Sequence, residues 1–308
     1  MDANLVATRF VHFAAAMLLF GASLFRLYAG AGEAGGQRVE AAFRRWLANA
    51  LLIAAIAAFL SALAWWDALA VYMGDGWADA LNGGTLSAVL FDTVFGRVWI
   101  WRLVIGAALI AVLFAARSRV RIPHADPLVA VLSFALLVTL AAVGHGAMHE
   151  GAARTFHETA QAIHLIAAGA WIGALVPLGY VLGKAALEGG DWTTFLLHAL
   201  PRFSRLGYFA VSFLLLSGVL LGGQMIGGLS GLFGTSYGRT VLVKICLFAL
   251  MTAVALFNRF DLTPRIVSAH RRQKHKPMLR LFWRSVLFEQ GLALAALMAA
   301  SILGTLHP

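Results

Sequence analysis

The histidines are the residues of this chain whose chemistry and placement are most informative. Six of the ten fall at or near the same ends of its hydrophobic segments, namely His12, His145, His149, His157, His164 and His307. Imidazole is a ligand for copper, zinc, iron and nickel, and paired imidazoles on facing membrane helices also hold haem. Polar rings gathered at one depth of an apolar protein therefore indicate a metal or haem site.

Two neighbouring segments can each present ligands on one helical face. His145, Met148 and His149 are spaced i, i+3 and i+4, and His157 and His164 are spaced i and i+7. The connection between the segments is short, so we expect the two faces to lie side by side. The thioether of methionine favours Cu(I). The predicted metal ligands are His12, His145, Met148, His149, His157 and His164.

The position of each histidine decides how strongly it indicates function. His12 and His164 lie inside apolar segments, where an unpaired polar group is costly and a functional role is the default hypothesis. For His157 or His307 alone, a solvated loop residue is the competing interpretation. The remaining histidines lie among basic residues and are interpreted as solvated: His124, His198, His270 and His275.

The composition is that of a membrane protein. The chain of 308 residues is 61% hydrophobic and 12% charged, with a mean hydropathy of +0.81, which is too apolar for a soluble domain. Continuous Leu/Ala-rich runs, rather than alternating ones, predict helices that cross the membrane instead of a β-barrel. We expect an all-α integral membrane protein with eight spans, near residues 5–27, 46–72, 96–116, 127–148, 158–183, 206–226, 239–258 and 284–304.

The basic residues predict the orientation of these spans. All but six of the 24 lysines and arginines lie in the connections between spans 1 and 2, 3 and 4, 5 and 6, and 7 and 8. The positive-inside rule makes those connections cytoplasmic and both termini periplasmic. The first residues lack the basic region of a cleavable signal peptide, so we expect the first span to be retained. The net charge of +10 then reflects topology and attraction to anionic membrane lipids, not nucleic-acid binding.

The sequence also contains an internal similarity. Residues 93–102 and 235–244 align without gaps as T-x-[FY]-G-R-x4-[RK], and His12 and His164 are each followed nine residues later by Gly-Ala. Four spans per unit give two halves of the same orientation, related by a pseudo-twofold axis along the membrane normal. This 4+4 repeat predicts that His12 and His164 are counterparts at similar depth, facing a common interface. Residues 1–125 hold spans 1–3 of the first repeat, 126–156 the fourth span and the His-rich periplasmic junction, and 157–308 the second repeat.

Other polar and aromatic residues inside the spans have less specific interpretations. Glu289 lies in an apolar helix and is either paired, with Lys244, Asn258 or Arg259 as candidate partners, or part of a proton relay. Cys246 is the single cysteine and is interpreted as a packing residue. The tryptophans are interpreted as interfacial belt residues, namely Trp65, Trp66, Trp77, Trp99 and Trp101.

Several short motifs, in this order, resemble the copper resistance protein D family, the CopD/PcoD membrane proteins. They are Gly144-His145, the segment 164–173 (HLIAAGAWIG), Arg202-Phe203-Ser204, the segment 235–239 (TSYGR) with Lys244, and Asn258-Arg259 before Pro264. The resemblance implies an inner-membrane protein of copper homeostasis and resistance that moves copper from periplasm to cytoplasm. It also implies a separate periplasmic copper-binding partner of the CopC type. Within the matching motifs, His145, His149 and His164 are the first candidates for copper ligands.

Three functions remain open at this stage. The first is a copper permease, a transporter rather than an enzyme, which has no catalytic residue and carries Cu(I) or Cu(II). In it, His145, His149 and His157 capture the ion and His12 with His164 pass it inward. The second is a b-type haem redox protein with His12 and His164 as axial ligands. The third is a copper sensor or assembly factor that binds copper without transporting it.

Overall fold

The fold is an all-helical bundle that crosses the membrane. A computed structural model describes residues 3–30, 35–74, 76–79, 81–117, 124–143, 150–271 and 276–306. Within these ranges, eight helices are long and apolar enough to span a bilayer, which confirms the expected number of spans. The chain is therefore a multi-pass membrane protein.

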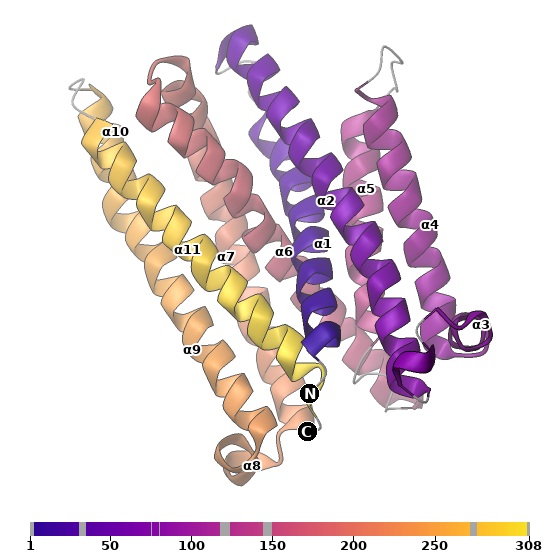
Figure 1. The fold of residues 1–308 in the computed structure, drawn as a ribbon. Coiled ribbons are helices and arrows are strands. Elements are labelled where there is room, and N and C mark those ends of the chain that lie inside the picture. Colours follow the sequence, from indigo (N-terminus) through magenta and orange to yellow (C-terminus); the bar gives the residue numbers. More distant parts are fainter. Residues whose placement is uncertain are drawn as a thin grey trace.

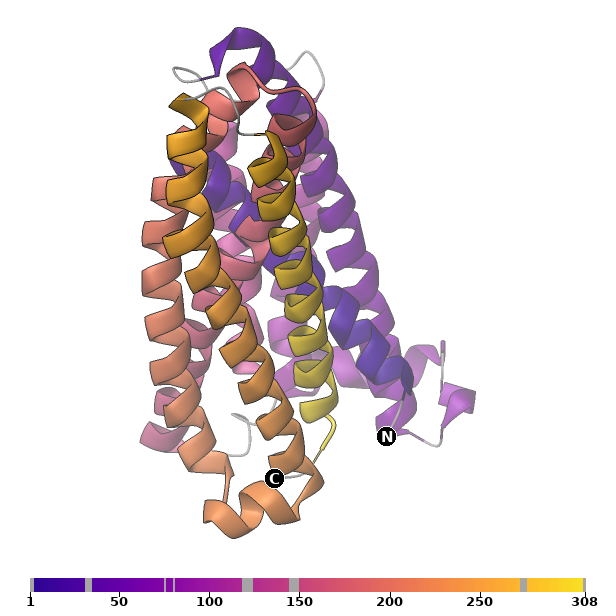
Figure 2. The ribbon, with the colours of Figure 1, turned by 90° about the vertical axis from the view of Figure 1, so that its left-hand side faces the viewer.

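The spanning helices are joined by short helices and tight connections. The spans are α1 (Ala3–Ala29), α2 (Gly36–Met73), α4 (Val94–Ala115), α5 (Ala125–Val138) continued by η2 (Thr139–Ala142), α6 (Gly151–Leu187), α7 (Asp191–Met225), α9 (Ser236–Phe257) and α11 (Lys276–Leu303). The short elements are η1 (Trp77–Asp79), α3 (Gly83–Phe91), α8 (Gly228–Gly234), the π-helical η4 (Asn258–Leu262) and α10 (Thr263–Arg271). Because the number of spans is even, both termini lie at one end of the bundle (Figures 1 and 2). We call this the terminal end and the opposite one the basic end.

Several helices start well before the segments predicted from hydropathy. α2 begins at Gly36 rather than near residue 46, α7 at Asp191 rather than 206, and α11 at Lys276 rather than 284. All three extensions lie at the basic end and carry polar and charged residues that headgroups and water can solvate. Hydropathy detects only the part of a helix inside the hydrocarbon core, so these turns were missed.

Two groups of four helices meet at α1 and α6. α1 packs against α2 and α5, and α6 packs against α7 and α11, while α1 and α6 also pack against each other. Figure 1 shows α4 and α5 on one side of this pair and α9 and α11 on the other. α6 is the most buried of the spans, as expected for a helix covered by neighbours on several sides.

Glycines permit the close contact between α1 and α6. A Cβ on Gly21 would collide with the backbone of Gly169 and Gly173, and a Cβ on Gly173 would collide with the carbonyl oxygen of Met17. Gly169 and Gly173 form a G-x-x-x-G pair, a spacing that lets membrane helices approach backbone to backbone. The two groups of helices are therefore joined by a seam with almost no side chains at its centre.

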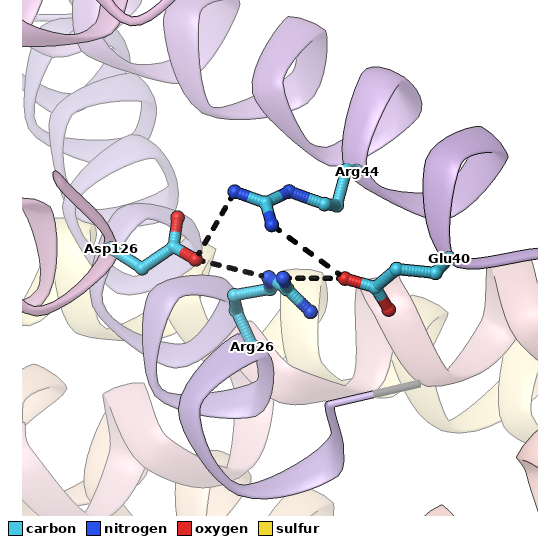
Figure 3. A network of polar contacts seen from close by, with 4 residues as sticks. All are labelled: Arg26, Glu40, Arg44 and Asp126. Carbon is cyan, nitrogen blue, oxygen red and sulfur yellow. Dashed lines mark ion pairs between the residues drawn. The ribbon is translucent and has the colours of Figure 1, made fainter. Parts of the chain in front are cut away.

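A charge network fixes the basic end of the first group. Arg26 of α1 pairs with Glu40 of α2 at 2.5 Å and with Asp126 of α5 at 3.3 Å, and Arg44 of α2 lies 3.7 to 3.9 Å from the same two carboxylates (Figure 3). The network links three helices through alternating charges. Because its members are partly exposed, we assign it to alignment of the helix ends and not to a large share of the stability.

Candidate functional site

His12 is buried between α1, α2 and α4 and uses both ring nitrogens. Its Nδ1 lies 3.0 Å from the carbonyl oxygen of Ala58 and 3.1 Å from the hydroxyl of Ser61. Its Nε2 contacts the guanidinium of Arg102. A guanidinium can only donate, so Nε2 accepts, and the proton lies on Nδ1, which donates to Ala58. We call His12, Ser61 and Arg102 the first histidine site.

Arg102 brings an unneutralised positive charge into the first histidine site. Only 1% of its surface is exposed, and its Nη1 donates to the carbonyl of Leu136 and the hydroxyl of Thr139, both at 2.6 Å. Its guanidinium carbon also lies 5.1 Å from the ring centre of Trp99. No ion pair within the described residues includes Arg102.

These contacts argue against the prediction that His12 is a metal ligand. A metal ion needs a free nitrogen lone pair and a neutral or negative surrounding, and the first histidine site has an occupied lone pair and a fixed cation. The same contacts remove His12 as an axial ligand of haem in this conformation. Arg102 itself points inward and is buried.

His164 occupies the corresponding place on α6 but is left open. Its Nδ1 lies 3.0 Å from the hydroxyl of Ser217 on α7. That hydroxyl donates to the carbonyl of Phe213 at 2.5 Å, so its oxygen accepts from His164, and the proton of the ring is on Nδ1. The lone pair on Nε2 accepts no hydrogen bond from any residue that the structure describes. His164 is half-buried, and the lone pair is available for a ligand.

Lys244, the basic residue near His164, does not occupy the free nitrogen of the ring. Lys244 of α9 lies within electrostatic range of His164, but no hydrogen bond joins the two side chains in the described part of the chain. We call His164, Ser217 and Lys244 the second histidine site. The helices around the two sites also pack differently. At the first site α2 and α4 pack together, whereas at the second α7 and α9 make little contact. The first site is thus closed and the second is open.

His12 and His164 do not share an interface. The ring of His12 contacts α2 and α4, and the ring of His164 contacts α7. The expectation that they face one another across the seam is therefore wrong, because each ring points into its own group of helices. A haem held by this pair of histidines does not fit the arrangement.

His157 lies two turns nearer the terminal end on the same face of α6 as His164. It is buried, and its Nδ1 lies 3.0 Å from the side-chain oxygen of Gln224 on α7. Seven residues of helix separate the two histidines by about 10 Å, so they suit two successive binding positions better than one chelate. Across the described ranges, no three His, Cys, Asp or Glu side chains gather as a metal site.

The remaining predicted ligands lie outside the described residues. These are His145, Met148 and His149, and the same holds for His307. The described helix before them ends at Ala142, and Val143 is already extended. The shared helical face expected for them stays a prediction.

Glu289 is paired and buried near the middle of α11. Its carboxylate accepts hydrogen bonds from the indole of Trp171 at 3.0 Å and from the amide of Asn258 at 3.3 Å. Asn258 was one of its expected partners, whereas no contact with Lys244 is found in the described part of the chain. Glu289 thereby ties α6 and the start of η4 to α11, and this geometry favours the structural over the relay interpretation.

Sequence reasoning missed the partners of the two histidines. Trp65 and Trp99, interpreted as belt residues, are buried, and both rings lie 5.8 Å from the ring of His12. The available signal was the alignment of Arg102 with Lys244, which puts a basic residue at the same place in both halves. Ser61 and Ser217 have no distinguishing motif and could not have been selected.

Sequence comparison relates the chain to the copper resistance protein D family. Residues 1–155 match the family described as copper resistance protein D-like, N-terminal domain, and residues 197–303 match the family copper resistance protein D. The chain is 35% identical to inner membrane protein YebZ of Escherichia coli (strain K12), with 98% of each chain covered. It is 33% identical to copper resistance protein D of Pseudomonas syringae pv. tomato, covering 98% of this chain and 96% of that one.

A third relative is matched over part of its length. The chain is 30% identical over 189 residues to copper transport protein CutJ of Bacillus subtilis (strain 168), covering 60% of this chain and 34% of that protein. No solved structure matches the chain.

Proposed function

The chain belongs to the copper resistance protein D family, and from this we propose that it moves copper from the periplasm towards the cytoplasm through the second histidine site. One observation carries the proposal: Ser217 fixes the proton of His164 on Nδ1 and leaves Nε2 open. A histidine that ligates a metal through one nitrogen is commonly held in this way through the other.

The surroundings of His164 suit a cation better than those of His12. Lysine can be neutral in an apolar environment, whereas arginine keeps its charge. Lys244 also leaves space, because it does not bond the ring as Arg102 does. The entry position in this proposal is His157 at the terminal end, with His145, Met148 and His149 of the preceding segment as further ligands.

We infer an orientation in the inner membrane with both termini in the periplasm. The support is the excess of lysine and arginine at the basic end, which the positive-inside rule makes cytoplasmic. Both histidine sites lie in the terminal half, since His12 is nine residues, or about 14 Å of helix, from the start of α1 at Ala3. In this orientation copper reaches His157 and His164 from the periplasm, and a periplasmic copper-binding protein of the CopC type would deliver it.

We also propose that the two groups of helices are a parallel 4+4 repeat. Thr93 and Thr235 make the same N-terminal cap, each accepting at 2.9 Å from the backbone of the glycine three residues later. Each group also contains a histidine, a serine bonded to its Nδ1 and a basic residue on the third span. Gly21 and Gly173, at equal distances from the two histidines, approach each other at the seam, as a pseudo-twofold axis requires.

Copper binding and transport are tested on the purified full chain. We expect wild-type protein to bind copper and to carry it into proteoliposomes, and we expect His164→Ala to lose most of both activities. His198→Ala is the matched control, because His198 lies on α7 and contacts Arg202 rather than the second site. Equal copper binding by His164→Ala and wild type would contradict the site.

The same experiment separates the competing functions. Binding that depends on His164 without uptake above empty vesicles would favour a sensor or assembly factor. A Soret absorption band that survives purification and disappears in His164→Ala would indicate a haem protein. Both Cu(I) and Cu(II) are supplied, because imidazole accepts either ion.

A further inference from the structure

A groove runs along the outside of the bundle at the basic end, between α2, α6 and α11. It is open to the outside, has a volume of about 340 Å³ and lies away from both histidine sites. Its lining residues are Trp46, Val176, Gly179, Tyr180, Gly183, Lys184, Leu187, Trp283, Leu287 and Gln290. The lining is apolar and aromatic except for Lys184 near the end of α6 and Gln290 deeper in the bundle.

The walls of the groove are held in place by specific contacts. Trp46 of α2 stacks on Tyr180 of α6, with ring centres 4.0 Å apart and planes 8° from parallel. On the other side, the amide of Gln290 donates to the carbonyl of Leu175 at 2.7 Å. A Cβ on Gly183 would lie 3.2 Å from the indole of Trp283, so this glycine lets α11 approach. The groove is therefore a preformed feature.

The depth of the groove matches one leaflet of a bilayer. From Leu187 to Val176 the α6 wall covers eleven residues of helix, or about 16 Å. Half of the hydrocarbon core is about 15 Å thick. A single acyl chain entering at the basic end would fill the groove and end near the midplane.

The mouth of the groove carries an excess of positive charge. Lys184 lies at the mouth, Arg45 is within electrostatic range of Tyr180, and Arg38 is within range of Glu188. Lys276 adds a fourth basic group beside Gly189. The acidic groups at this corner are Glu188, which pairs with Lys184 at 2.7 Å, and Asp191, whose carboxylate lies near Gly36. Four basic groups against two acidic ones favour an anion.

We propose that this groove is a binding site for an anionic phospholipid of the leaflet at the basic end. The acyl chain lies between Trp46 and Trp283, and the phosphate is held by Lys184 and Arg45 at the mouth. Tyrosine and tryptophan beside basic side chains are typical at headgroup depth. The proposal is independent of copper binding, since no residue of the histidine sites takes part.

The test measures lipid retained by the full chain in native mass spectrometry after purification in detergent. Protein is exposed to phosphatidylglycerol or phosphatidylcholine with identical acyl chains. We expect selective retention of phosphatidylglycerol, reduced about fivefold by Lys184→Gln and roughly 25-fold by Lys184→Gln with Arg45→Gln. Arg265→Gln on α10, at the same end but outside the lining of the groove, is the control and should retain phosphatidylglycerol as wild type does.

A second variant tests the groove apart from the charges. Val176→Phe places a larger side chain where the acyl chain would end, and we expect it to lower retention of both lipids. Equal retention of the two lipids by wild type would overturn the proposal. So would a wild-type dimer that Val176→Phe converts to monomer without any change in bound lipid, because the groove would then receive a second copy of the chain.

Discussion

Each intramembrane histidine has a serine hydroxyl beside Nδ1, and the decisive difference between the two rings is at Nε2. In the first site the guanidinium of Arg102 reaches that nitrogen, whereas in the second Lys244 is near but not bonded. We therefore expect two sites with the same histidine and serine to differ in their capacity for a metal ion. The identity and reach of one basic side chain account for the difference.

Replacing Lys244 by arginine should close the second histidine site. In Lys244→Arg, we expect the longer, planar guanidinium to donate to Nε2 of His164 and to keep its charge. Copper affinity should then fall by about 10- to 100-fold, the range found when the environment of a metal ligand is disturbed. Isothermal titration of the purified variant measures this change. Lys244→Met, which removes the charge and cannot donate, should bind at least as well as wild type, and equal losses in both variants would show that Lys244 itself is needed.

At the scale of the helices, the seam between α1 and α6 depends on the absence of side chains. Gly173→Leu would place a branched side chain against the carbonyl of Met17 and the backbone of Gly21. We expect a loss of about 1 to 3 kcal/mol or more, as for other overpacked positions. The measurement is the midpoint of thermal unfolding in detergent. Gly223→Leu on α7, where an added Cβ meets nothing within 4 Å, is the control, and an unchanged midpoint in Gly173→Leu would contradict the close contact.

Hydropathy predicted where the helices lie in the sequence better than how far each is rotated about its own axis. The eight spans could be predicted because about 20 apolar residues are needed to cross a bilayer whatever the neighbours are. The equal spacing of His12 and His164 to Gly21 and Gly173 predicts a similar depth for the two histidines. Where each ring points depends on how far a helix is rotated about its axis, and that rotation is fixed by contacts between distant residues. Arg102 was missed for this reason, since its partner Leu136 lies on α5.

At the scale of the whole molecule, the orientation in the membrane has a direct test. Cys246 is the single cysteine, so Cys246→Ser gives a background for new labels. Leu81→Cys lies at the terminal end and Leu187→Cys at the basic end, and both positions are exposed. We expect a membrane-impermeant maleimide to label Leu81→Cys and not Leu187→Cys in intact cells. Both should react after permeabilisation, and the reverse pattern in intact cells would place the termini in the cytoplasm.

The glycine seam also limits how the protein could change shape. Backbone atoms of Gly21 and Gly173 meet without intervening side chains, so rocking one half against the other would separate surfaces with nothing to fill the gap. α9 is the least enclosed span and makes little contact with α7. In the proposed transport, alternating access would then arise from movement of α9, which carries Lys244, along α11, against which it packs, while α1 and α6 stay fixed together.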